Sequence, residues 1–173
     1  MKVYLTRQCK YLGFTMSDTS QMRNKLGDFS SIVCFKAVVV GTEEALGEKA
    51  AAIALISAGR NRGKQVAEQL GLEGKGLTNT EIVPMLQAAL GKDGTRLCII
   101  DKIVESGETI LAYCSETICS AGEPQGSPRK LTFTLGAVQG VLEKVTGKRL
   151  RGKQTESVLR GGSHDVIEFE VLA

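Results

Sequence analysis

The clearest hydrophobic pattern in the chain lies in residues 131–145. Apolar residues recur there at steps of four and three: Leu131, Leu135, Val138, Leu142 and Val145. This spacing predicts a helix with one apolar side, and Gly147 suits the left-handed position that ends a helix. Gly136 and Gly140 lie four residues apart on one face. Because glycine costs a helix about 1 kcal/mol relative to alanine, they indicate that another backbone or a ligand packs very close.

Two strands are predicted after this helix. Residues 148–153 are rich in Lys and Arg, and a glycine-rich turn at 161–163 precedes the final segment, 166–171. In that segment Ile167, Phe169 and Val171 alternate with glutamates, which places them on one face opposite Glu168 and Glu170. We interpret the basic stretch as a charged strand face with a helix cap, and phosphate contact is the alternative.

The longest helical pattern runs from Thr42 to Leu70. Thr42 is expected to be its N-cap, and a bend is expected near Gly59. The middle of the helix consists of small residues, which indicates either tight helix–helix packing or the wall of a groove. The preceding residues 32–40 are β-branched and apolar around Lys36, and they predict a strand or a buried extended segment.

The middle of the chain predicts a short helix and a hairpin. Thr78 and Glu81 fit a capping box for a helix that ends at Leu90. Residues 96–104 and 109–114 are expected to pair around a turn at Ser106 and Gly107. Residues 115–128 are expected to begin as a helix and to end as a loop.

These elements predict a single α+β domain over residues 1–173, with a helical layer packed on a small antiparallel sheet. Residues 1–31 are interpreted as an N-terminal arm, with a short strand or an edge segment in residues 1–13. No repeat at a fixed period is visible.

Composition narrows the function classes. The net charge of +3 and the 5% of aromatic residues do not indicate nucleic-acid binding. We expect neither a secretory signal nor a transmembrane segment, since the longest apolar run is too short for one. We therefore expect a cytosolic protein, and contact with a membrane surface stays open. The five cysteines are odd in number and spread out, which favours reduced core thiols.

Catalytic and metal chemistry has little support in the residues. Cys114, Cys119 and His164 suggest a zinc site only with a distant fourth ligand, and a Cys119–His164 nucleophile pair lacks any sign of proximity. The segment from Gly59 to Lys64 fails as a phosphate loop because only three residues separate its glycines, where the motif needs four, and no Ser or Thr follows the lysine. We therefore predict no catalytic residues, no metal site and no cofactor.

Residues 97–171 resemble the 4-vinyl reductase-type small-molecule-binding domain, also called a hydrocarbon-binding domain. The resemblance rests on the paired strands, on the helix Phe133–Leu142 with its two glycines, on Thr146–Arg149, on Thr155–Gly161 and on Ile167–Val171. That family is similar in fold to the Bet-three subunits of the transport-protein-particle (TRAPP) complex. The resemblance implies a TRAPP-like fold that is commonly dimeric and has a cavity for a long apolar ligand.

The chain departs from the family pattern at its cysteines. The family places them shortly after the glutamate of the last hairpin and before its final phenylalanine. This chain has Ser157 or Val158 and Ile167 at those places. Thiol or metal chemistry that depends on those cysteines is therefore not expected here.

The sequence leads to a non-catalytic binding protein for a hydrophobic small molecule, such as an acyl chain, a hydrocarbon or a tetrapyrrole. We predict a homodimer with an internal cavity. The alternatives are a dimeric scaffold or assembly factor without a ligand, with protein partners in a larger assembly, and an enzyme of (bacterio)chlorophyll metabolism. The residues predicted to bind the ligand are Ala51, Leu55, Ala58, Arg60, Arg62, Leu135, Gly136, Val138 and Gly140. Arg60 or Arg62 is expected to hold an acidic head at the cavity mouth, and a large residue at Gly136 is expected to abolish binding without unfolding the protein.

Overall fold

The computed structural model describes residues 23, 25, 30–75, 78–92 and 94–172. The short strand expected in residues 1–13 and most of the N-terminal arm lie outside them. The described elements are α1 (Ile32–Gln69), α2 (Asn79–Leu90), β1 (Ile99–Ser106), β2 (Thr109–Ser115), α3 (Phe133–Thr146), β3 (Arg149–Glu156), the 3-10 turn η1 (Val158–Arg160) and β4 (Asp165–Leu172).

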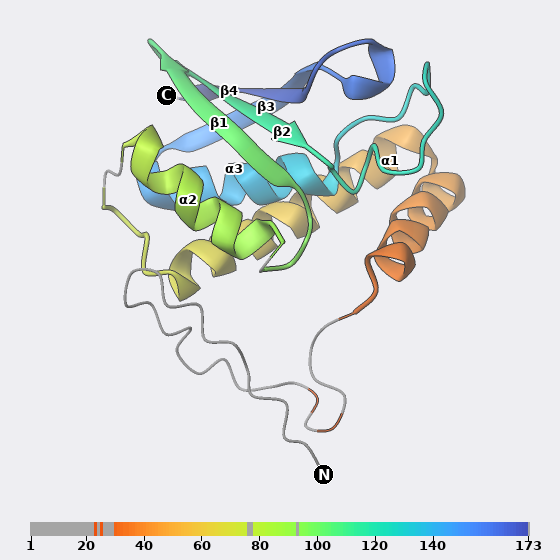
Figure 1. The fold of residues 1–173 in the computed structure, drawn as a ribbon, viewed down its shortest axis with the longest axis horizontal. Helices are drawn as coiled ribbons and strands as arrows, with labels where there is room; N and C mark the ends of the chain where they lie inside the picture. Colours follow the sequence, from red (N-terminus) through yellow and green to blue (C-terminus); the bar gives the residue numbers. More distant parts are fainter. Residues whose placement is uncertain (1–22, 24, 26–29, 76–77, 93, 173) are drawn as a thin grey trace.

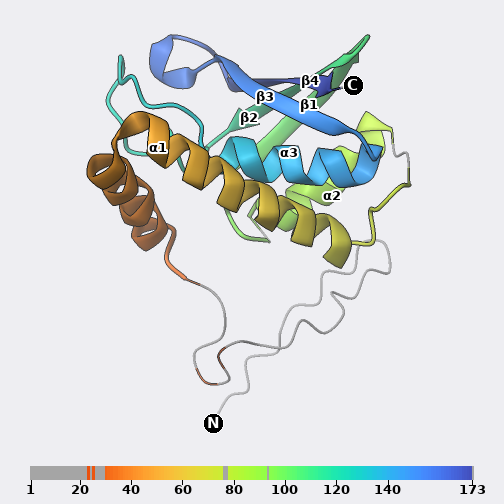
Figure 2. The same ribbon diagram turned by 180° about the vertical axis from the view of Figure 1, so that it is seen from behind.

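Four antiparallel strands form an open sheet in the order β1-β2-β4-β3. The three helices lie on one side of this sheet, as the two opposite views show (Figure 1, Figure 2). The predicted α+β class, with helices over a small antiparallel sheet, is confirmed. Ile167 and Phe169 of β4 are fully buried, and they pack with α3 residues in the main core.

Local signals read from the sequence decide the ends of two helices. Thr78 and Glu81 form the predicted capping box at the start of α2. Gly147 ends α3 with a left-handed backbone, φ +69°, and its N–H donates to the carbonyl of Glu143. This conformation is unfavourable for residues that carry a Cβ, which explains why glycine occupies the position.

Three local predictions are wrong. Residues 32–40 form the first turns of α1 instead of a strand, so the helix does not begin at Thr42, whose hydroxyl donates to the carbonyl of Val38 inside the helix. The break in α1 lies at Gly47, with φ +75° and ψ 160°, and not near Gly59. Residues 116–128 contain turns and bends without a helix.

Tertiary contacts explain why the β-branched run is helical. Phe35 and Val39 are one helical turn apart, and both pack against Ala51 and Leu55 across the break at Gly47. Lys36, on another side of the same turn, donates to the carbonyl of Cys119 at 2.7 Å. A helix presents these residues on the required faces, and this packing overrides the β propensity of the run.

Candidate functional site

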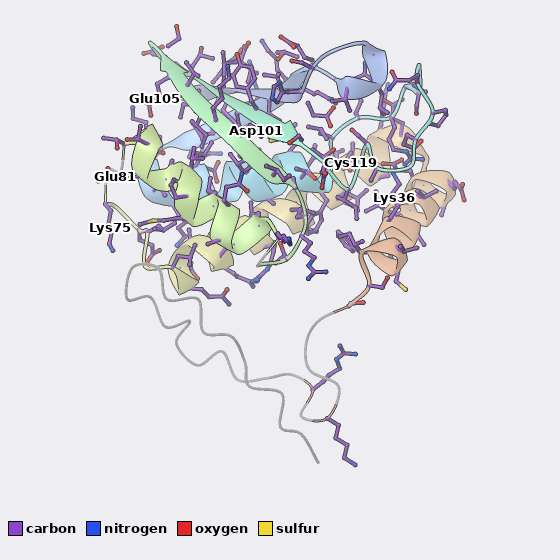
Figure 3. All side chains as sticks on the ribbon, viewed as in Figure 1. Lys36, Lys75, Glu81, Asp101, Glu105 and Cys119 are labelled. Atoms are coloured by element: carbon purple, nitrogen blue, oxygen red, sulfur yellow. The ribbon has the colours of Figure 1, made fainter. Side chains whose placement is uncertain are left out.

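Residues 32–46 of α1 bend away from the rest of the helix at Gly47 (Figure 1). From here on, the arm means these residues and not residues 1–31. Ion pairs hold the arm against the loop before α3. Lys36 pairs with Glu123 at 2.8 Å, and Arg129 contacts both Glu123 and Glu43. Burial raises the pKa of Glu123, but the hydrogen bonds from Lys36 and Arg129 outweigh it and lower that pKa overall. Figure 3 shows Lys36 on the arm next to Cys119 on the loop.

A mainly apolar pocket of about 330 Å³ opens where the arm begins. Its apolar walls are Ile32, Phe35 and Val38, and Thr95 approaches from the loop after α2. Ser30, Ser31 and Cys34 complete the lining. The volume lies within the range typical of small-molecule sites, and a mixture of apolar side chains with hydroxyl groups is typical of such pockets.

Phe35 connects this apolar pocket to the protein interior. Its ring packs edge-on against Phe133 of α3, with a centroid distance of 4.8 Å. It also packs against the cluster that contains Ala51 and Leu55. Two of the residues predicted to bind a ligand therefore lie directly behind the pocket wall.

The predicted glycine face of α3 meets the backbone of α1. A Cβ at Gly136 would collide with the carbonyl oxygen of Ile56, and one at Gly140 with that of Arg60. Gly59 and Gly63 of α1 are in the same situation against α3. We call these four residues the glycine seam. Of the two explanations offered by the sequence, another backbone or a ligand, the structure places a backbone there.

The nine predicted ligand-binding residues fall in separate places. Leu135 and Val138 belong to the main core, together with the buried glycines of the seam. Ala58 is exposed, and Arg62 lies at the surface with its guanidinium 3.4 Å from Gln69. Arg60 pairs with Glu143. These residues do not line one common pocket in the described part of the chain, and their role in ligand binding stays a prediction.

Sequence reasoning missed the apolar pocket because it assigned residues 32–40 of the arm to a strand or a buried extended segment. The missed residues are Ile32, Cys34, Phe35 and Val38. A helical signal was available: Cys34 and Val38 are four residues apart, as are Phe35 and Val39, and no proline separates the arm from the helical pattern that follows. The pairing of the arm with residues 116–130 had no sequence signal.

The sequence named Cys114, Cys119 and His164 as possible reactive groups, and the structure shows their surroundings. Cys98, Cys114 and Cys119 are buried and free. The hydrogen bond between Cys114 and Cys98, followed by burial, raises the pKa of Cys114 well above its ordinary value. His164 contacts Ser163 at 2.9 Å and Asp101 at 3.7 Å. Among the described residues, no three His, Cys, Asp or Glu side chains are arranged to hold a metal ion.

The fold is shared with solved proteins of low sequence identity. The phenol-responsive sensory domain of the transcription activator PoxR, solved with phenol, has a TM-score of 0.61 and 14% identity over 83% of this chain and 76% of that one. A trafficking protein particle complex subunit 3 from Naegleria fowleri, covalently bound to palmitic acid, has a TM-score of 0.53 and 14% identity over 82% and 93%. The chain has the TRAPP-like fold.

A vinyl-4-reductase family protein from Methanocaldococcus jannaschii is similar at a TM-score of 0.45 and 14% identity, over 82% of this chain and 79% of that one. No protein-family model matches the sequence. No curated protein matches it either. The similarity to the PoxR domain and to the trafficking subunit concerns the fold.

The 4-vinyl reductase-type family has cysteines at two positions, which Ser157 or Val158 and Ile167 occupy in this chain. Ser157 and Ile167 have structural roles here. Ser157 is buried, and its hydroxyl accepts a hydrogen bond from the N–H of Leu159 at the start of η1. Ile167 is fully buried in the core. Nearby Asp165 is buried and accepts hydrogen bonds from Ser120 at 2.5 Å and Thr117 at 2.8 Å. These contacts tie the loop after β2 to β4.

Within the described residues, none of the helices is both long and apolar enough to cross a lipid bilayer.

Proposed function

We propose that this protein is a non-catalytic binding protein for a hydrophobic small molecule, and that the apolar pocket at the start of the arm is its entrance. The observation that carries the proposal is a pocket of about 330 Å³ with Ile32, Phe35 and Val38 as its walls. Two proteins of the same fold were solved with phenol and with palmitic acid. Burial of an apolar ligand contributes about 0.8 kcal/mol for each CH₂ group enclosed.

The internal part of the site is proposed to lie behind Phe35. Val39, Ala51 and Leu55 form a small apolar cluster there, and Phe35 separates them from the pocket. Rotation of the Phe35 ring would join the pocket to this cluster. Ala51 and Leu55 would then contact the ligand, as the sequence predicts.

The chemistry of the pocket supports binding over catalysis. Its lining side chains are Ser, Ile, Cys, Phe, Val and Thr. Among the described lining residues the thiol is that of Cys34, which would need a base to act as a nucleophile. The single histidine of the chain, His164, lies against Asp101 and Ser163 and does not line this pocket.

The pocket is tested with a neutral apolar fluorophore, N-phenyl-1-naphthylamine, and a matched pair of variants. Val38, 59% exposed, lines the pocket, whereas Val104, 39% exposed, lies on β1 outside it. We expect Val38→Lys to weaken binding of the probe about tenfold or more, because the ammonium group disfavours an apolar ligand beside it. Val104→Lys should bind like the parent. Equal affinities in both variants would contradict this location.

Native mass spectrometry after purification without detergent tests whether a small molecule co-purifies with the protein. The expected result is a protein mass with an adduct that organic extraction recovers as a lipid, hydrocarbon or pigment. The absence of an adduct, together with no binding of the fluorophore, would contradict a carrier function.

A second candidate function is a homodimeric scaffold, and the surface of α1 favours it. Five of the seven large hydrophobic side chains exposed in the described residues lie on this helix: Ile32, Val33, Val38, Leu46 and Ile53. Beyond the break, α1 also has an exposed face without charges, formed by Ala50, Ile53, Ala54, Ser57, Ala58, Asn61 and Gln65. Small uncharged residues allow a second helix to approach closely, so we propose that a second copy packs here.

Light scattering after size exclusion tests the dimer. We expect the parent to be a dimer, and Ile53→Lys, a change at a side chain that is 74% exposed, to shift it to a monomer. Val104→Lys is the control and should remain dimeric. A parent that is monomeric at all accessible concentrations would contradict this candidate.

A further inference from the structure

A second pocket, of about 280 Å³, lies between α1, the end of α3 and the start of β3. It differs in chemistry from the apolar pocket and shares no lining residue with it. Five of its lining side chains are cationic, and one is a carboxylate: Arg60, Lys64, Lys144, Lys148 and Arg149, with Glu143. We call it the basic pocket.

Glu143 is already committed to structural contacts. It is 7% exposed, and its two oxygens accept hydrogen bonds from Nε and Nη2 of Arg60, both at 2.7 Å. The backbone N–H of Leu150 donates to it at 3.0 Å, and the amide of Gln139 at 3.3 Å. This carboxylate therefore fixes the Arg60 guanidinium at the pocket and has little capacity to neutralise the other cations.

Among the described residues, Lys144 also has close carboxylate partners, whereas Lys64, Lys148 and Arg149 do not. Lys144 pairs with Glu68 at 2.7 Å and Glu73 at 2.5 Å. Lys64 reaches Glu143 only at 3.5 Å.

Within the described residues, no carboxylate pairs with the side chain of Lys148 or Arg149. Both side chains are exposed. Arg60 likewise has Nη1 left over after its bidentate contact with Glu143. The pocket thus has an excess of positive charge with donors that are available to a ligand.

The number and origin of these donors favour phosphate as the ligand group. A phosphate monoester carries close to two negative charges and has three acceptor oxygens, so it matches cations that converge from three elements. A single carboxylate has fewer acceptor sites and one charge. The concave shape also concentrates the positive potential, which isolated surface lysines do not achieve.

We propose that the basic pocket binds a phosphate group carried by a soluble metabolite or by a lipid head. Arg60 and Lys64 on α1 contact the phosphate from one side, and Lys148 and Arg149 from the other. The proposal does not depend on the apolar pocket, because the two sites share no residue.

Calorimetry with glycerol 3-phosphate tests the soluble source, and co-sedimentation with phosphatidylcholine vesicles, with and without phosphatidic acid, tests the lipid source. The pocket variant carries Lys148→Ala and Arg149→Ala, both at exposed positions. The control variant carries Lys49→Ala and Lys92→Ala, which remove the same charge from exposed positions outside the pocket. Circular dichroism verifies that all proteins are folded.

We expect the pocket variant to bind at least about tenfold more weakly than the parent, because it loses two charge-assisted contacts. The control should keep the parent's affinity. Saturable binding of glycerol 3-phosphate assigns a soluble ligand, and capture by phosphatidic acid vesicles alone assigns a lipid. The proposal is overturned if the parent binds neither probe, or if both variants lose affinity equally, as expected for non-specific attraction.

Discussion

At the scale of single residues, the four glycines of the seam set the distance between α1 and α3. Gly136 and Gly140 face backbone carbonyls of α1, while Gly59 and Gly63 face backbone carbonyls of α3. Each glycine weakens its own helix, but together they allow two backbones to pack without intervening side chains. The energetic role of these glycines is therefore in packing, and their intrinsic helix propensity is secondary.

Gly136→Ala is expected to destabilise the protein by about 1–3 kcal/mol, because the new methyl group collides with the rigid carbonyl of Ile56. Urea denaturation measures the change. Gly41→Ala in the same helix pair is the control, since a Cβ there meets open space. It should stabilise the protein by about 1 kcal/mol through helix propensity. Equal stability of Gly136→Ala and the parent would mean that the seam is looser than described.

Gly136→Leu, expected from the sequence to leave a folded protein, should therefore disrupt the packing of α1 on α3 as well. It is unsuitable as a test of ligand binding alone. The Val38→Lys change in the apolar pocket avoids this problem, because Val38 is exposed.

Glu143 is expected to make the stability of the protein depend on pH. Burial raises its pKa, but hydrogen bonds from Arg60, the Leu150 amide and Gln139 outweigh burial and lower the pKa below the ordinary 4.5. A lowered folded-state pKa means that Glu143 contributes stability above pH 4.5, and that this contribution is lost as the pH falls through the lower folded-state pKa.

Urea denaturation of the parent and of Glu143→Gln at neutral pH and at successively lower pH measures this effect. The parent should be more stable than the variant at neutral pH, and the difference should shrink below pH 4.5. The other carboxylates are common to both proteins, so the difference isolates Glu143. A difference that stays constant with pH would contradict the role of its charge.

At the scale of elements, α1 is two helical segments that one residue connects. Gly47 has φ +75° and ψ 160°, a conformation that nearly only glycine adopts. The break directs the arm toward the loop before α3, where Lys36 and Arg129 make ion pairs. The apolar pocket lies at the start of this arm, where Thr95 approaches it from the loop after α2.

Gly47→Ala is expected to release the arm, since the strain of about 1–3 kcal/mol is relieved if the two segments straighten into one helix. Hydrogen–deuterium exchange should then be faster for the backbone amides of loop residues 116–130 and should change in residues 32–46. Gly41→Ala, inside the arm and with regular helical geometry, should leave the loop unchanged. Unchanged exchange in both variants would show that the break does not depend on glycine.

At the scale of the whole molecule, one core joins the helices to the sheet. It contains Cys98 and Cys114 of the sheet region and Cys119 of the following loop, all buried. Cys34 on the arm is exposed. The cysteines therefore report on two different parts of the fold.

We expect N-ethylmaleimide to modify Cys34 rapidly in the native protein, whereas the three core cysteines should react only after unfolding. Burial excludes the reagent, and the raised pKa of Cys114 keeps that thiol protonated. Mass spectrometry of proteolytic peptides measures each site and also separates Cys9, which lies outside the described residues. The urea-unfolded protein is the control, and native labelling of Cys114 as fast as that of Cys34 would contradict this core.

The sequence by itself determined those features that depend on short-range patterns. The apolar spacing in residues 131–145 predicts α3, and the Thr78–Glu81 capping box and Gly147 define helix ends through contacts within a few residues. Alternation in residues 166–171 predicts that Ile167 and Phe169 share one face of β4, and both side chains are buried there. The glycine pair at 136 and 140 correctly indicates a close approach, because that inference needs only helical periodicity.

Only the tertiary structure decided what approaches those glycines and where the pockets lie. The backbone of α1 fills the space at the seam. The arm is helical because Phe35 and Val39 pack across the break onto Ala51 and Leu55, a contact that local propensity does not encode. Arg60 meets Glu143 across 83 positions of sequence. Such pairings depend on how the whole chain packs, so the apolar pocket and the basic pocket both follow from the fold.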